Sequence, residues 1–174
     1  MTSPEVTLRP AEPEDAALLF GWRGEASVRR YQPLTPLTAG QLRSEISSRR
    51  HQDLYGERGS RFDWIVQYDG RAVGWITLVV HSWEHGLGEC GYAVSTPFQG
   101  RGIMSRAFSL LLDDLFANTS LFRIEARCAL ENFASQRVLE KLGFRREGVL
   151  RGYFQLRGDR IDNLLFARVR ADSD

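Results

Sequence analysis

The stretch from Gly91 to Phe116, GYAVSTPFQGRGIMSRAFSLLLDDLF, decides the fold of this chain. It begins with a short alternating apolar segment and passes through a turn that contains Gly100 and Gly102. Apolar residues then recur three and four positions apart, which places them on one side of a helix about three and a half turns long. These residues are Met104, Ala107, Phe108, Leu111, Leu112, Leu115 and Phe116. The stretch therefore predicts a strand, a glycine turn and a helix.

The glycine turn lies where the predicted helix begins. Unpaired backbone N–H groups and the positive end of the helix dipole favour an anion at such a place, and phosphate is a common occupant. Gly100 and Gly102 let the backbone approach a bulky anion, and Arg101 adds a positive charge between them. A tight strand–helix connection that needs glycine only for its dihedral angles explains the same residues. The turn alone leaves both interpretations open.

Two common phosphate loops fit poorly. A Walker A loop is excluded because Gly102 is followed by Ile103 and Met104, and the chain's only lysine is Lys141. A dinucleotide-binding fingerprint requires an acid at the tip of the next strand, whereas Glu125 lies within its predicted strand.

Residues 99–104, Gln-Gly-Arg-Gly-Ile-Met, resemble the Gln/Arg-x-x-Gly-x-Gly/Ala coenzyme A pyrophosphate loop of the GNAT acetyltransferases, with Met104 replacing the last small residue. Residues 132–144, NFASQRVLEKLGF, are similar to the Asn-x-x-Ser-x-x-Val-Leu-Glu-Lys-x-Gly-Phe segment of the RimJ/RimL branch, which contains ribosomal-protein N-terminal acetyltransferases. Residues 89–92, Glu-Cys-Gly-Tyr, precede the loop as they do in that branch. Two ordered motifs at family spacing are more specific than either motif alone.

The resemblance implies a GNAT fold: a mixed α/β structure with a predominantly antiparallel sheet, split at a central parallel strand pair, and helices on both faces. It also implies acetyl-CoA as co-substrate. We expect three segments to bind it through Tyr92, Ala93, Val94, Gln99, Gly100, Arg101, Gly102, Ile103, Met104, Asn132 and Ser135.

Hydrophobic periodicity supports the same order of elements. Helices are predicted over 11–23, from a Thr38–Gln41 capping box onward, over 104–116 and over 132–142. A polar loop is expected over 81–88 and a surface loop over 47–60. Strands are predicted over 6–9, 61–68, 71–80, 89–94, 123–129, 145–156 and 160–168.

Length and composition predict one globular N-acetyltransferase domain over residues 1–174, with a core of about 6–170. The 23 basic residues nearly balance the 22 acidic ones, giving a net charge of +1. This argues against nucleic acid or a membrane surface as the main partner.

Cys90 and Cys128 fall in predicted strands and are expected to be reduced core thiols. No apolar run approaches the length of a signal or transmembrane segment, so a cytoplasmic protein is expected. We expect it to be a monomer or a homodimer.

Acetyl transfer to an amine requires a neutral amine, a polarised carbonyl and a leaving thiolate. Glu89 is the predicted base because it begins the strand that enters the loop; a solvated strand-edge charge is the alternative. The resemblance places Ser135 near the thioester sulfur, where a weak donor suffices because a thiolate leaves with little help. A plain helix-start serine is the alternative there. The tyrosine that many GNAT enzymes carry near the end of this helix is replaced by Leu139.

The resemblance also implies that the two central strands diverge and that backbone N–H groups around Tyr92 to Val94 polarise the carbonyl. Direct transfer in a ternary complex is expected, because neither cysteine has an apparent histidine partner. His81 and His85 fall in the predicted loop without a third ligand, so no metal site is predicted.

The acceptor is expected to be a primary amine, with a protein N-terminal α-amine favoured. At pH 7 an α-amine with a pKa near 7.7–8.0 is roughly a tenth neutral, against about four parts in ten thousand for a lysine amine. A polyamine or aminoglycoside acceptor, and a non-catalytic acyl-CoA sensor, are the alternatives. The candidate acceptor-site walls, each of which fits core or edge packing equally well, are Trp22, Tyr31, Tyr153 and Asp162.

Overall fold

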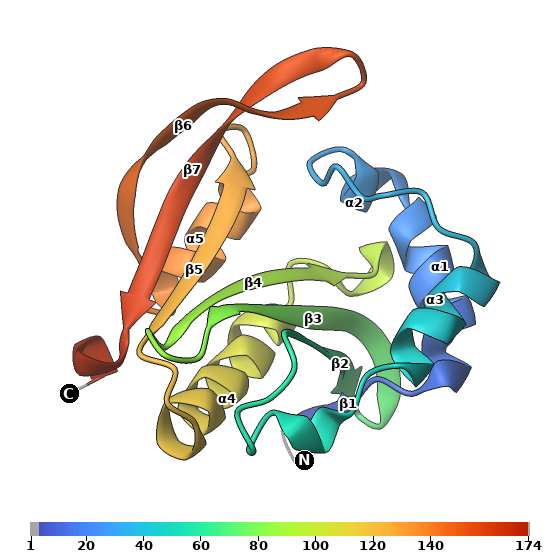
Figure 1. Ribbon diagram of the computed structural model, residues 1–174. Coiled ribbons are helices and arrows are strands. Elements are labelled where there is room, and N and C mark those ends of the chain that lie inside the picture. The colour runs from blue at the N-terminus through green and yellow to red at the C-terminus, as the bar shows by residue number, and fades with distance from the viewer. Residues whose placement is uncertain (1–3, 174) are drawn as a thin grey trace.

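Seven strands form one sheet in the order β1-β2-β3-β4-β5-β7-β6 in the computed structural model, which describes residues 4–173 (Figure 1). Neighbouring strands are antiparallel except β4 and β5, which are parallel. This confirms the predicted mixed sheet with one central parallel pair. The strands are β1 (Val6–Pro10), β2 (Arg61–Tyr68), β3 (Arg71–Ser82), β4 (Leu87–Val94), β5 (Arg123–Ala129), β6 (Arg145–Leu156) and β7 (Asp159–Val169).

The helices lie where the periodicity predicts them, with one short addition. They are α1 (Ala16–Gly24), α2 (Ala26–Arg29), α3 (Ala39–Ser47), α4 (Ile103–Asn118) and α5 (Phe133–Lys141). The predicted capping box opens α3: the Gln41 amide donates to Thr38 Oγ1 over 3.2 Å, and the Thr38 amide donates to Gln41 Oε1 over 2.8 Å. The apolar residues predicted along α4 are all buried.

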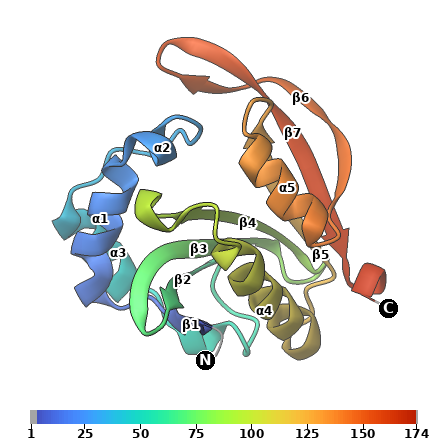
Figure 2. The same cartoon turned by 180° about the vertical axis from the view of Figure 1, so that it is seen from behind.

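Helices cover both faces of the sheet, as predicted. One face, which we call the α4–α5 face, packs against those two helices (Figure 2). Its core contains Ile76, Phe108, Leu112, Ile124 and Phe166, each no more than 1% exposed. The other, the α1–α3 face, packs Ile65, Trp75 and Ala93 against the first three helices.

The predicted loops differ from the structure in two places. β3 continues to Ser82 through a β-bulge at Val80/Ser82, so His81 lies in a strand instead of a loop. The expected surface loop after α3 contains a 3₁₀ helix, His51–Asp53, and Leu54 is fully buried. In both places the polar local sequence predicts a loop, whereas strand pairing with β4 and the burial of Leu54 produce ordered structure. No helix within the described part of the chain is long and apolar enough to cross a membrane.

Candidate functional site

The parallel strands β4 and β5 diverge. They pair only over Leu87–Glu89 and Arg123–Glu125, although β4 continues to Val94 and β5 to Ala129. Beyond that point β4 stays paired with β3, and β5 stays paired with β7. The second half of β4 therefore has an edge that β5 does not cover, which offers backbone hydrogen-bonding groups.

Two glutamine side chains bind carbonyl groups of this half of β4. Gln32 Nε2 donates to the Tyr92 carbonyl over 2.8 Å, and Gln99 Nε2 donates to the Val94 carbonyl over 2.9 Å. Gln32 follows α2 and was not among the predicted site residues. No local pattern could have identified it, because its partner is 60 residues away in the sequence.

The glycine turn has the open geometry that a ligand-binding loop requires. Gly100 and Gly102 have positive φ angles of 74° and 71°, which favour glycine. A Cβ at either position would meet no atom within 4 Å. Gly102 is the N-cap of α4, and the Arg101 guanidinium lies over the Phe98 ring, 5.3 Å from its centroid. The turn thus presents exposed backbone at a helix N-terminus.

Four of the residues expected at the coenzyme have little side chain to offer a ligand. Ile103 and Met104 are 2% and 6% exposed and pack in the core. Ala93 and Val94 are each 9% exposed. A ligand at the turn or along β4 would therefore contact the backbone of these residues and not their side chains.

Tyr92 and Ser135 meet between β4 and α5. The Tyr92 hydroxyl lies 2.8 Å from Ser135 Oγ, and its ring packs on Phe108 with centroids 5.3 Å apart. Burial raises the pKa of Tyr92 well above its ordinary value, so the phenol stays neutral and can donate a hydrogen bond, but it is a weaker acid than a free tyrosine. Asn132 Oδ1 accepts from the Ser135 amide over 3.1 Å and so caps α5. Only the Tyr92 backbone was expected at the site, and no sequence signal pointed to its hydroxyl.

Glu89 belongs to a group of charged side chains on the α1–α3 face. Its Oε2 forms an ion pair with Arg127 Nη1 and lies 3.1 Å from His81 Nε2. Arg127 also contacts Glu125 over 3.2 Å, and its guanidinium lies 5.2 Å from the Tyr153 ring centroid. The Glu89 side chain is 23% exposed, so it is a partnered carboxylate and not a solvated strand-edge charge.

This group joins four strands: His81 from β3, Glu89 from β4, Arg127 from β5 and Tyr153 from β6. His81 was not predicted as a partner of Glu89, because a loop was expected there. Arg127 was not predicted either, because neighbours across two diverging strands leave no periodic signal in one sequence.

The two cysteines are free and buried, as predicted. Burial raises the pKa of Cys90 strongly and that of Cys128 to about 11. Neither is a thiolate at neutral pH, which is the form that attacks a thioester.

The predicted acceptor-site walls separate into different environments. Trp22 is 7% exposed and its ring stacks on that of Trp75 with centroids 6.3 Å apart, which corresponds to core packing, the alternative that the sequence left open. Tyr31 is half-buried beneath the Arg30 guanidinium. Asp162 Oδ1 accepts from the Gly152 amide over 2.7 Å and stabilises the irregular part of β6. Tyr153 contacts the charged group around Glu89.

Metal ligands do not cluster in the part of the chain that the structure describes: no group of three or more His, Cys, Asp or Glu side chains there could hold a metal ion.

A family model described as acetyltransferase (GNAT) domain matches residues 5–145. The chain belongs to the GNAT acetyltransferase family. It is 33% identical over 168 residues to the uncharacterized N-acetyltransferase p20 of Bacillus licheniformis, covering 96% of this chain and 94% of p20. It is 31% identical to the spermidine N(1)-acetyltransferase of Escherichia coli (strain K12), covering 88% of this chain and 80% of that protein.

Among solved structures, Mycobacterium smegmatis RimJ in complex with CoA-disulfide aligns with a TM-score of 0.82 and 29% identity. The alignment covers 94% of this chain and 81% of RimJ. The chain is thus a GNAT N-acetyltransferase of the RimJ/RimL-like branch.

Proposed function

We propose that this GNAT enzyme transfers an acetyl group from acetyl-CoA directly to a protein N-terminal α-amine in a ternary complex. The observation that carries the proposal is the divergence of β4 from β5 next to the open glycine turn. A divergent edge supplies backbone donors for the thioester arm, and a helix N-terminus supplies N–H groups for a pyrophosphate.

In this proposal the coenzyme's pyrophosphate binds the backbone N–H groups between Gly100 and Met104, beside Arg101. Asn132 and Ser135 lie along the pantetheine arm. Backbone N–H groups of Tyr92 to Val94 polarise the thioester carbonyl, and such a donor is typically worth about 3 kcal/mol in acyl transfer.

Proton transfer is assigned to two groups. Glu89 accepts the proton of the attacking amine, while Arg127 and His81 hold its carboxylate in place. The Tyr92–Ser135 hydroxyl pair donates a hydrogen bond to the departing thiolate, and a proton from water, relayed through this pair, reprotonates the sulfur; the thiolate, whose conjugate acid has a pKa of ~8.5, needs little help to leave.

The acceptor assignment rests on the RimJ/RimL-like membership and on the pKa of an α-amine, which leaves far more neutral amine at pH 7 than a lysine does. A second candidate is a polyamine, and the observation that favours it is the 31% identity to a spermidine acetyltransferase.

The deciding experiment measures thioester cleavage with a panel of amines. We expect the highest kcat/KM with short peptides that have free N-termini. The comparison acceptors are N-blocked peptides containing lysine, spermidine and an aminoglycoside. A preference for any of these three would contradict the N-terminal assignment, and no cleavage with any amine would favour a sensor that only binds acyl-CoA.

Coenzyme binding has its own test. Acetyl-CoA should raise the Tm of the native protein by linkage, and Gly102→Asp should abolish the shift by placing an acid against the pyrophosphate. Gly102→Ala is the matched control, because it carries the same strain at φ 71° without the charge and should retain part of the shift. Absence of any shift in the native protein would contradict both the enzyme and the sensor.

A further inference from the structure

A pocket of about 330 Å³ lies on the α1–α3 face of the sheet, the face that also carries Glu89. This volume is within the range of sites for small organic ligands. One part of its lining is apolar and includes Leu19, Leu34, Leu37, Leu42 and Trp75. The remainder is polar and includes Arg23, Glu45, Arg49, Arg61, Asp63 and Thr77. We call it the arginine pocket.

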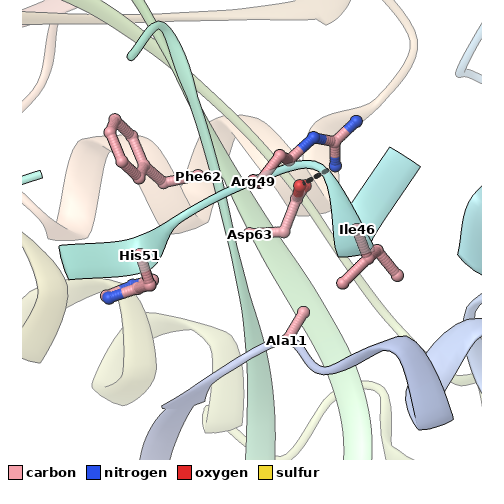
Figure 3. A pocket seen from close by; sticks show the side chains of 6 residues that line it. All are labelled: Ala11, Ile46, Arg49, His51, Phe62 and Asp63. Carbon is pink, nitrogen blue, oxygen red and sulfur yellow. Dashed lines mark hydrogen bonds and ion pairs between the residues drawn. The ribbon is translucent and has the colours of Figure 1, made fainter. Parts of the chain in front are cut away.

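Both acids of the arginine pocket are already occupied. Asp63 forms an ion pair with Arg49 and accepts from Thr77 Oγ1 over 2.6 Å. Figure 3 draws a neighbouring pocket that shares Ile46, Arg49 and Asp63 with the arginine pocket, and it shows the Arg49 guanidinium and the Asp63 carboxylate pointing toward one another. Glu45 binds the same arginine over 2.7 Å. The pair of acids is thus satisfied mainly by one arginine.

The other two arginines retain donor capacity. The nearest carboxylate contact of Arg61 in the pocket is 3.6 Å, to an Asp63 oxygen that Arg49 also uses. Arg23 donates to the Thr35 carbonyl over 2.8 Å, and within residues 4–173 it forms no ion pair within 4.0 Å. Burial and the nearby Arg61 charge lower the pKa of Arg23, yet a guanidinium stays protonated. The pocket therefore has an excess of positive charge.

The register of the sheet connects this pocket to β4. Asp63 pairs with Thr77, and Thr77 pairs with Gly91, two residues beyond Glu89 on the same face. Adjacent strands lie ~4.8 Å apart, so Asp63 and Gly91 are about 10 Å apart across the sheet. An extended chain rises ~3.3 Å per residue, so about three residues span that distance.

We propose that the arginine pocket binds an organic carboxylate and that this carboxylate is the acidic end of the amine acceptor. Guanidinium groups bind carboxylates through paired, charge-assisted hydrogen bonds, and the apolar wall fits the carbon chain. The link to the acceptor rests on the proposed N-terminal acetylation, and it predicts an acidic residue at position 2 or 3 of the acceptor peptide. A polyamine would instead bring cations against Arg23 and Arg61.

The pocket is tested without any reaction by titrating hexanoate and hexylamine into the protein, followed by calorimetry or NMR. Hexanoate should bind saturably, Arg23→Gln should weaken it at least tenfold, and hexylamine should not bind. Arg61→Gln is a second variant with the same expected direction. Arg43→Gln is the control, because Arg43 pairs with Glu14 and does not line the pocket. Hexanoate that does not bind, or binds Arg23→Gln as tightly as the native protein, would overturn the site.

The link to the acceptor is tested with peptides that differ only by Glu or Gln at position 2 or 3. The native enzyme should prefer the Glu peptides at least tenfold in kcat/KM, and Arg23→Gln should remove the preference. Equal use of both peptides by the native enzyme would refute the link to the acceptor. If no peptide is acetylated, the N-terminal assignment and this link both fail, while hexanoate binding still decides whether the pocket is an anion site.

Discussion

The two faces of the central sheet differ although the same strands build them. On β4, Cys90 points into the core of the α4–α5 face, while Glu89 lies on the α1–α3 face among charged partners. On β2, Trp64 is buried in the core of the α4–α5 face, whereas Asp63 lies on the α1–α3 face and pairs with Arg49. Because side chains alternate along a strand, adjacent residues belong to different environments.

The difference follows from how far helices cover each face. The long helix α4 and the helix α5 cover their face with one continuous apolar cluster. The first three helices bury a smaller cluster that includes Ile65, Trp75 and Ala93, and Glu89, Arg127 and the arginine pocket lie on this same face. One face thus supplies most of the hydrophobic stability, and the other holds the polar groups proposed for binding and proton transfer.

The largest effect is expected on the stability of the α4–α5 face. Leu112→Ala removes a fully buried side chain and should lower the free energy of unfolding by about 3 kcal/mol. Urea denaturation measures this change. Leu110→Ala on the same helix is the control, since Leu110 is 49% exposed and should cost less than about 1 kcal/mol. Equal losses for the two variants would mean that the packed face does not dominate stability.

On the α1–α3 face the expected effect is on rate. Glu89→Gln should lower kcat about 100-fold, or about 2.7 kcal/mol in activation free energy, because it removes the proposed base. Glu147→Gln is the control: it removes a carboxylate that pairs with Arg123, farther along the sheet. Steady-state kinetics at saturating acetyl-CoA compare the two. A loss below fivefold for Glu89→Gln would assign proton removal to water or to another group.

A smaller effect is expected on the pH dependence of stability, through a histidine beside the core of the α4–α5 face. His51 lies edge-on to Trp64 at 4.9 Å, and burial lowers its pKa from the ordinary value of 6.5. The unfolded chain therefore binds more protons at this site, so stability should fall as the pH decreases through about 6.5 and level off below the folded-state pKa. His51→Phe should reduce this loss of Tm between pH 7.5 and 5.5 by a few degrees. An unchanged slope in His51→Phe would contradict this assignment.

The smallest effect is expected from the cysteines, since raised pKa values keep both thiols protonated. Replacing Cys90 and Cys128 together with alanine should change kcat/KM less than threefold. Initial-velocity plots should intersect, as they do for a ternary complex. Parallel lines, or the loss of activity in a folded double variant, would indicate an acetyl-cysteine intermediate.

Local sequence signals predicted those elements whose causes are local. The periodicity from Met104 to Phe116 located α4, and the Thr38–Gln41 pair located the start of α3, because contacts within one or two turns produce both patterns. The glycine turn was predictable for the same reason: its positive φ angles require glycine at Gly100 and Gly102. Motif spacing then predicted the family.

The partners of the site residues were not predictable in this way. His81 was expected in a loop, and it lies beside Glu89 because a β-bulge carries β3 past Val80. Trp22 fitted an acceptor-site wall and core packing equally well, and it is buried because it stacks on Trp75 from another element. Each of these positions depends on contacts between segments far apart in the sequence.

The sequence by itself determined the order of strands and helices, the turn before α4, the buried side of that helix and the membership of the GNAT family. Only the tertiary structure decided that Glu89 is paired with Arg127, that the Tyr92 hydroxyl meets Ser135, and that Arg23 and Arg61 lie in one pocket. The physical reason is the range of the interactions. Backbone preference and amphipathic periodicity act between near neighbours, whereas ion pairs and pockets form only after the strand register brings distant residues together.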